Sequence, residues 1–161
     1  MQGFKIAQAS LLLAALSFSS SPIHAAVSPF SALAGAWSGG GVLNTSDGAQ
    51  ERLRCRAAYN VGGAGAELRL NLRCASASYN FDLTSDVQYR GGAISGSWTE
   101  SSRNASGTLS GRANSGHIEV SARGQNFAAE LSLTTRGNRQ SVSIHPQGTN
   151  VTAVSLELDR R

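Results

Sequence analysis

The chain has 161 residues, a formal net charge of +4 and 15% charged residues. This length allows one domain with one core and excludes a multidomain protein. The modest positive charge permits an anionic partner without requiring one.

The first predicted element is a secretory signal peptide over residues 1–25. Lys5 supplies its positive start, residues 6–18 form a short apolar run, and small residues lead to Ala25 and Ala26. We expect cleavage after one of these two alanines. Polar residues interrupt the apolar run, which is shorter than the roughly 20 residues that a membrane-spanning helix needs. We therefore expect a periplasmic or secreted protein with no transmembrane anchor after cleavage.

We expect an N-terminal segment over residues 26–34, followed by a single β-barrel domain over residues 35–161. In this domain, short runs that alternate apolar with polar residues are separated by clusters of Gly, Asn, Asp and Ser, which is typical of all-β proteins. Consecutive hairpins give an antiparallel up-and-down meander, which removes its edges by closing into a barrel of 8–10 strands. A sandwich is the alternative. The strands are expected at roughly 35–45, 50–61, 66–76, 79–89, 93–101, 104–113, 117–123, 126–135, 139–145 and 150–159.

The two cysteines lie in the second and third predicted strands. If the chain turns at residues 62–65, Cys55 and Cys74 are direct antiparallel partners. Paired residues project to the same face of a sheet, and here that face is apolar. An exported chain with two cysteines favours a disulfide, so we predict a cross-strand bond between them.

The opposite face of the same hairpin carries five arginines, and we interpret it as a candidate surface for an anionic partner such as an envelope component. The alternative is a solvated outer face of a barrel with no partner. No aromatic residues alternate with the arginines to stack on bases, so we expect no nucleic acid partner. The five residues are Arg52, Arg54, Arg56, Arg69 and Arg73.

Three short repeats resemble a serine nucleophile motif: GAWSG at 35–39, GAISG at 92–96 and GTLSG at 107–111. In the nucleophile elbow the serine lies midway between two glycines at a strand-to-helix turn. Here the serine directly precedes the second glycine, and no helix follows. We interpret the glycines as points of bending or close backbone approach. A tight turn between the fifth and sixth strands would pair Trp98 with Gly107, so that the ring covers a bare glycine.

No motif predicts a catalytic, metal or cofactor site. The domain has two histidines, His117 and His145, and neither has a metal ligand at the usual spacing. His117 alternates with Glu119 on one strand, which we interpret as an exposed polar face. Phosphate, dinucleotide and calcium loops are also missing from the sequence. We therefore expect a protein that is not an enzyme.

A barrel interior could bind a small apolar ligand. The candidate lining residues are the aromatic side chains Tyr59, Phe81, Trp98 and Phe127. The alternative is an interior filled by Leu, Val and Ala side chains, which would bind nothing.

The segment FSALAGAWSGGG at 30–41 resembles the start of calycin-type barrels, in which a Gly-x-Trp element closes one end. Gly35 and Trp37 match that element. The resemblance implies a lipocalin-like or avidin-like meander barrel with a ligand cavity.

The chain also resembles, more narrowly, the small periplasmic inhibitors of bacterial metalloproteases. In that resemblance residues 26–32 are the inhibitory segment, residues 33–37 begin the first strand, and Cys55 and Cys74 form the single disulfide. This chain departs from those inhibitors by about two extra strands and by closer cysteines.

Three functions follow from these observations. The leading interpretation is a non-catalytic binding module, and the first alternative is a protease inhibitor or protein-interaction module. The second alternative is a small outer-membrane barrel with arginines in the lumen and leucines facing lipid. Strands such as SGTLSGRA at 106–113 are polar on both faces, and aromatic girdles are lacking, which argues against this last class.

Overall fold

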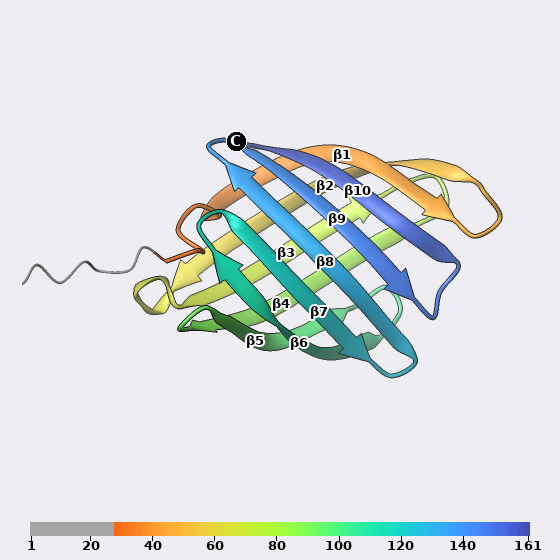
Figure 1. Cartoon of the computed structure of the whole chain (residues 1–161). Helices are drawn as coiled ribbons and strands as arrows, with labels where there is room; N and C mark the ends of the chain where they lie inside the picture. Colours follow the sequence, from red (N-terminus) through yellow and green to blue (C-terminus); the bar gives the residue numbers. More distant parts are fainter. Residues whose placement is uncertain (1–27) are drawn as a thin grey trace, which may run out of the picture.

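The computed structural model describes residues 28–161, so the predicted signal peptide and cleavage site lie outside the described residues. Ten antiparallel strands form a closed barrel in which each strand pairs with the next and β10 pairs with β1 (Figure 1). The predicted meander barrel is confirmed at the upper end of its expected range, and the alternative sandwich is wrong. The strands are β1 (Gly35–Thr45), β2 (Gln50–Gly62), β3 (Glu67–Ala75), β4 (Asn80–Arg90), β5 (Ala93–Glu100), β6 (Ala105–Asn114), β7 (His117–Gly124), β8 (Phe127–Arg136), β9 (Arg139–Gln147) and β10 (Val151–Arg160).

Alternation along the strands separates an apolar interior from a polar exterior. On β2, for example, Leu53, Cys55 and Ala57 are buried inside, while the arginines between them are exposed. Among residues 28–161, Val42 is the one large hydrophobic residue that is exposed. The leucines therefore face inward and the polar residues face outward, which is the reverse of the outer-membrane interpretation. In the described part of the chain, no helix is long and apolar enough to cross a membrane.

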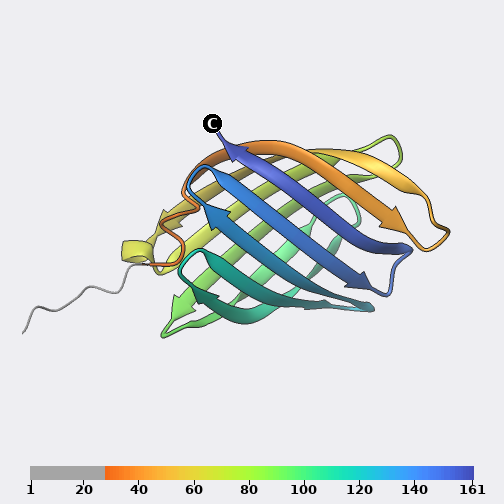
Figure 2. The ribbon, with the colours of Figure 1, turned by 45° about the horizontal axis from the view of Figure 1, so that its top comes forward.

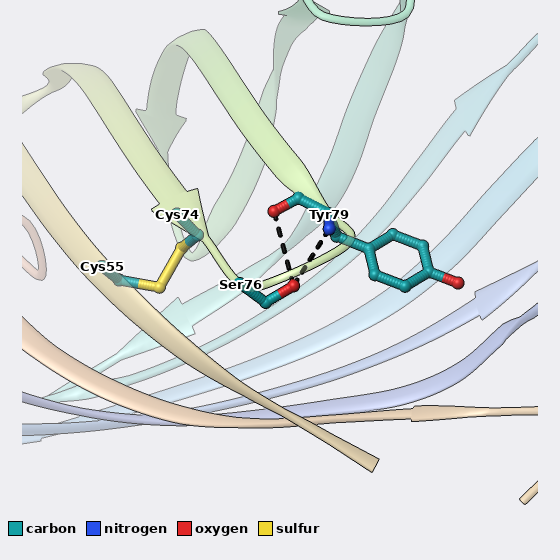
Figure 3. Close-up of a disulfide and its surroundings, with 4 residues drawn as sticks. All are labelled: Cys55, Cys74, Ser76 and Tyr79. Carbon is teal, nitrogen blue, oxygen red and sulfur yellow. Dashed lines mark hydrogen bonds between the residues drawn. A yellow bond between two sulfur atoms is a disulfide. The ribbon is translucent and has the colours of Figure 1, made fainter. Parts of the chain in front are cut away.

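The predicted pairing of β2 with β3 is confirmed: Cys55 lies opposite Cys74, and the two form a disulfide. Figure 3 shows this bond and the turn that follows β3. In that turn the backbone N–H of Tyr79 donates to the hydroxyl of Ser76 at 3.0 Å. The disulfide thus joins two neighbouring strands next to a hydrogen-bonded turn.

The second glycine of each repeat lies where two strands approach closely. A Cβ at Gly39 would collide with the backbone oxygen of Glu157, and one at Gly96 would collide with the backbone oxygen of Asp86. A Cβ at Gly111 would likewise collide with the backbone oxygen of Glu119. Our interpretation of the repeats as sites of close backbone approach is confirmed, and such glycines let a sheet curve into a barrel.

Trp98 pairs with Gly107, as the sequence predicts. Its ring extends over a second glycine as well, because a Cβ at Gly107 would lie 2.8 Å from Nε1 and one at Gly124 would lie 2.9 Å from Cζ2. The ring meets Phe127 edge to face, with 5.4 Å between centroids. One tryptophan therefore fills the space that two bare glycines leave.

The segment before β1 closes one end of the barrel, beside the C-terminus (Figure 2). We call residues 28–34 the N-terminal plug. Phe30 and Leu33 of the plug are 0% and 1% exposed. Trp37 Nε1 donates to the backbone oxygen of Leu33 at 2.7 Å. The Arg160 guanidinium lies 4.4 Å from the centroid of the Trp37 ring and donates to two backbone oxygens of the plug.

We predict that Gly96→Ala lowers the free energy of unfolding by roughly 1–3 kcal/mol, since the added methyl has to displace the backbone of β4. Urea denaturation measures the effect. The matched control is Gly62→Ala, where the nearest atom to the new Cβ is a flexible carboxylate oxygen at 3.6 Å. Equal stability of the two variants would contradict this explanation of the repeat.

Candidate functional site

The buried side chains inside the barrel fall into two clusters. The first extends from the plug along β1, β2 and β10 and includes buried residues of β3 to β7, and the second consists of Trp98, Ala122 and Ala129. A domain usually has one contiguous core. Leu109 and Ile144, which are only partly buried, border both clusters. The fully buried side chains thus form two clusters that Leu109 and Ile144 connect.

Partly exposed aliphatic side chains pack against one or both of these clusters. They come from β3, β4 and β6 to β9, and strand alternation points each of them inward. We call this set the aliphatic wall. Its members are Leu70, Leu72, Leu83, Leu109, Val120, Leu131, Leu133, Val142 and Ile144.

The closed end contains a buried polar chain. Tyr59 donates from its hydroxyl to Gln140 Oε1 at 2.8 Å, and Gln140 donates from Nε2 to the Thr135 hydroxyl at 3.3 Å. Burial raises the pKa of Tyr59. Tyr59 is therefore a neutral residue of the closed end.

The structure does not bring the four predicted lining aromatics together. Trp98 and Phe127 are in contact, but Tyr59 lies at the closed end. Phe81 stacks on Tyr79 with 6.3 Å between centroids, and the Arg103 guanidinium lies 4.7 Å from the Phe81 centroid. Spacing alone could not separate them, since all four alternate inward on different strands.

We call the end opposite the plug the mouth. It is formed by the loops at 46–49, 76–79, 101–104, 125–126 and 148–150. Side-chain hydrogen bonds connect its loops to one another. Within residues 28–161, no segment covers this end as the plug covers the other. The Tyr79 hydroxyl, for example, accepts a hydrogen bond from Asn150 Nδ2 at 2.7 Å.

Two carboxylates hold mouth loops. Glu100 accepts from the backbone N–H of Asp82 at 2.9 Å, of Ser102 at 3.2 Å and of Arg103 at 2.8 Å. Burial tends to raise the pKa of Glu100, but these hydrogen bonds outweigh it, and the net shift is downward. Glu51 accepts from the Ser76 hydroxyl and from the loop after β3, and these bonds lower its pKa.

The indole N–H of Trp98 has no hydrogen-bond partner. It is the one buried side-chain polar atom in this condition within residues 28–161. Trp98 is 5% exposed and belongs to the cluster nearer the mouth. An unpaired buried donor costs about 1–3 kcal/mol, so an acceptor at this position would be stabilising.

The five predicted arginines lie together on the outer face of β2 and β3. Two of them pair with carboxylates of β4: Arg69 with Asp86 at 2.7 Å, and Arg73 with Asp82 at 3.2 Å. Arg56 lies directly opposite Arg73. No role was predicted for the β4 carboxylates, because only the β3–β4 register places them beside the arginines.

His117 lies on the outer face as expected, with Nδ1 3.0 Å from the Thr134 hydroxyl and Nε2 3.3 Å from a Glu119 carboxylate oxygen. Arg160, by contrast, was missed by sequence reasoning. Its role depends on the pairing of the last strand with the first, and the only signal was a basic residue at the end of the last strand.

No protein-family model matches the chain, and no curated protein matches it. Two solved structures share its fold. One is Rv2717c from M. tuberculosis, with a TM-score of 0.66 and 15% identity over 81% of this chain and 94% of that chain. The other is the S-type phycobiliprotein lyase CPES from Guillardia theta, with a TM-score of 0.57 and 12% identity over 82% and 89%. These two likenesses support the fold alone, a closed antiparallel barrel.

We predict that Glu100→Gln lowers the free energy of unfolding at pH 7 by about 1–3 kcal/mol, because the backbone donors lose a charged acceptor. The folded-state pKa is below the ordinary value of about 4.5, so the unfolded chain binds protons first as pH falls. The contribution of Glu100 is therefore complete above that value and is lost as pH falls through the folded-state pKa.

The two stability curves should accordingly converge as pH is lowered below about 4.5. Urea denaturation from pH 7 to pH 3 measures this. Glu67→Gln, an exposed carboxylate at the other end of the barrel, is the control. A constant difference between wild type and Glu100→Gln across the range would show that charge is not the cause.

Proposed function

We propose that this protein is an exported, non-catalytic binding protein that holds a small apolar ligand inside its barrel. One observation carries the proposal: the side chains of the aliphatic wall point inward but are only partly buried, so the described side chains do not fill the whole interior. The plug closes one end, so the ligand enters through the mouth. An apolar lining with few polar groups is typical of small-molecule sites.

The wall indicates the chemistry of the ligand. Its side chains are aliphatic, so the ligand presents hydrocarbon to most of the site. The indole N–H of Trp98 is buried over Gly107 and is not part of this lining. A neutral molecule that is mostly hydrocarbon fits the aliphatic wall.

The buried plug weakens the case for protease inhibition. That function needs the N-terminal segment to reach a partner, but Pro29 and Phe30 are buried against the barrel of their own chain. Phe30 meets Tyr89 edge to face, with 6.1 Å between centroids. The N-terminal segment therefore covers the closed end of the barrel. For this reason we propose that the protein binds a small ligand and does not inhibit a protease.

Export rests on two features. Residues 1–25 have the layout of a signal peptide, and the Cys55–Cys74 disulfide suits an oxidising compartment. We expect the intact mass of protein from periplasmic extract to correspond to cleavage after Ala25 or Ala26, with the two hydrogens of the disulfide missing. A full-length, reduced mass would contradict export.

We predict that the neutral probe N-phenyl-1-naphthylamine binds with saturable fluorescence and that Leu131→Trp weakens binding roughly tenfold or more, since the larger ring fills the interior. Ser132→Trp is the control, because the neighbouring residue of β8 points outward. It should change the affinity by less than about twofold. Saturable binding that both variants leave unchanged would place the probe outside the barrel and refute the interior site.

A further inference from the structure

The outer surface of the barrel has a groove that is separate from the interior site. It has a volume of about 870 Å³ and crosses the outer face of β1 to β4. Its side chains alternate with those that point into the core, so the sheet itself separates the two sites. We call it the arginine groove. Its charged lining consists of Arg54, Arg56, Arg73, Asp82 and Arg161.

The groove carries an excess of positive charge. Arg56 and Arg73 are direct partners across β2 and β3, and like charges in this position repel. Within residues 28–161, neither Arg54 nor Arg56 forms an ion pair with a carboxylate. Asp82 is the single carboxylate in the lining, and it pairs with Nε of Arg73 at 3.2 Å. An anion between the arginines would relieve the repulsion.

The fold holds these arginines in place. Cys55 lies between Arg54 and Arg56 on β2, and Cys74 follows Arg73 on β3, so the disulfide joins the two strands directly beneath the groove. At its edge, Nε of Arg161 donates to the hydroxyl of Ser38. A covalent link between the arginine-bearing strands reduces the ordering that a ligand must impose.

We propose that the arginine groove binds a soluble small molecule with two or more phosphate groups. Guanidinium groups match phosphate oxygens through two parallel hydrogen bonds, which a point charge cannot do. The volume lies within the range of small-molecule sites. A compact ligand with several phosphates can contact arginines of β2, of β3 and of the C-terminus at the same time. Ser38, Asn80 and Ser102 add neutral polar groups to the lining.

The test is calorimetric titration of the full mature protein with sodium tripolyphosphate at low ionic strength. Wild type should bind with one-to-one stoichiometry, and added salt should weaken binding because the arginines are exposed. Arg54→Ala with Arg56→Ala should reduce the affinity roughly tenfold or more. Arg112→Ala with Arg123→Ala removes the same charge from β6 and β7 and should change it by less than about twofold.

Several outcomes would overturn the proposal. Equal losses in the two double variants would indicate a response to net charge alone. Binding to phosphatidylglycerol vesicles without binding to tripolyphosphate would indicate a membrane surface instead.

Circular dichroism should show unchanged melting of the groove variant. Should it melt lower, Arg73→Ala gives a second test, and unaltered tripolyphosphate affinity in that folded variant would refute the site. N-phenyl-1-naphthylamine binding should persist in every groove variant, because that probe reports the interior.

Discussion

Closure of the sheet depends on the contact between its first and last strands. Arg160 at the end of β10 lies over Trp37 near the start of β1, and the same guanidinium holds the backbone of the plug. Trp37 in turn donates to Leu33. This set of contacts determines which end of the barrel is closed, and thereby the direction from which a ligand could enter. The two clusters of buried side chains form only because the closed sheet brings residues of distant strands together.

The strands were predictable to within one or two residues because turn residues mark their ends. The register of β2 with β3 and of β5 with β6 followed from short turns between them, which fix both the disulfide and the Trp98–Gly107 pair. Contacts between distant strands were not predictable. Gln140 is fully buried beneath Tyr59, 81 residues away in the chain, and nothing local in the sequence marks it as an interior residue.

The candidate sites were predictable to different degrees. The outer arginines could be assigned to one face from alternation alone. Their positions depend only on how β2 pairs with β3, and the short turn between these strands determines that pairing. The interior could not be read in this way, because its lining depends on how ten strands surround a common space. Sequence reasoning pointed to four aromatic residues, and the structure adds a set of partly exposed aliphatic side chains that alternation alone did not single out.

One hairpin contributes to both proposed sites. Its inner face carries the disulfide and leucines of the core, and its outer face carries the arginine groove. Substitutions in β2 and β3 therefore have effects that depend on parity: odd positions of β2 change the interior, and even positions change the surface. The two proposed sites can therefore be tested by separate substitutions although they share a single sheet.

The bending glycines have a consequence for finding relatives of this chain. At Gly39, Gly96 and Gly111 any side chain would collide with the backbone of the neighbouring strand. Proteins that keep this curvature must keep glycine at these positions, even where the remaining residues have diverged to the 12–15% identity seen with the solved structures. The spacing of the Ser-Gly pairs on β1, β5 and β6 is therefore a usable search pattern, because it follows from the curvature of the barrel and not from any binding site.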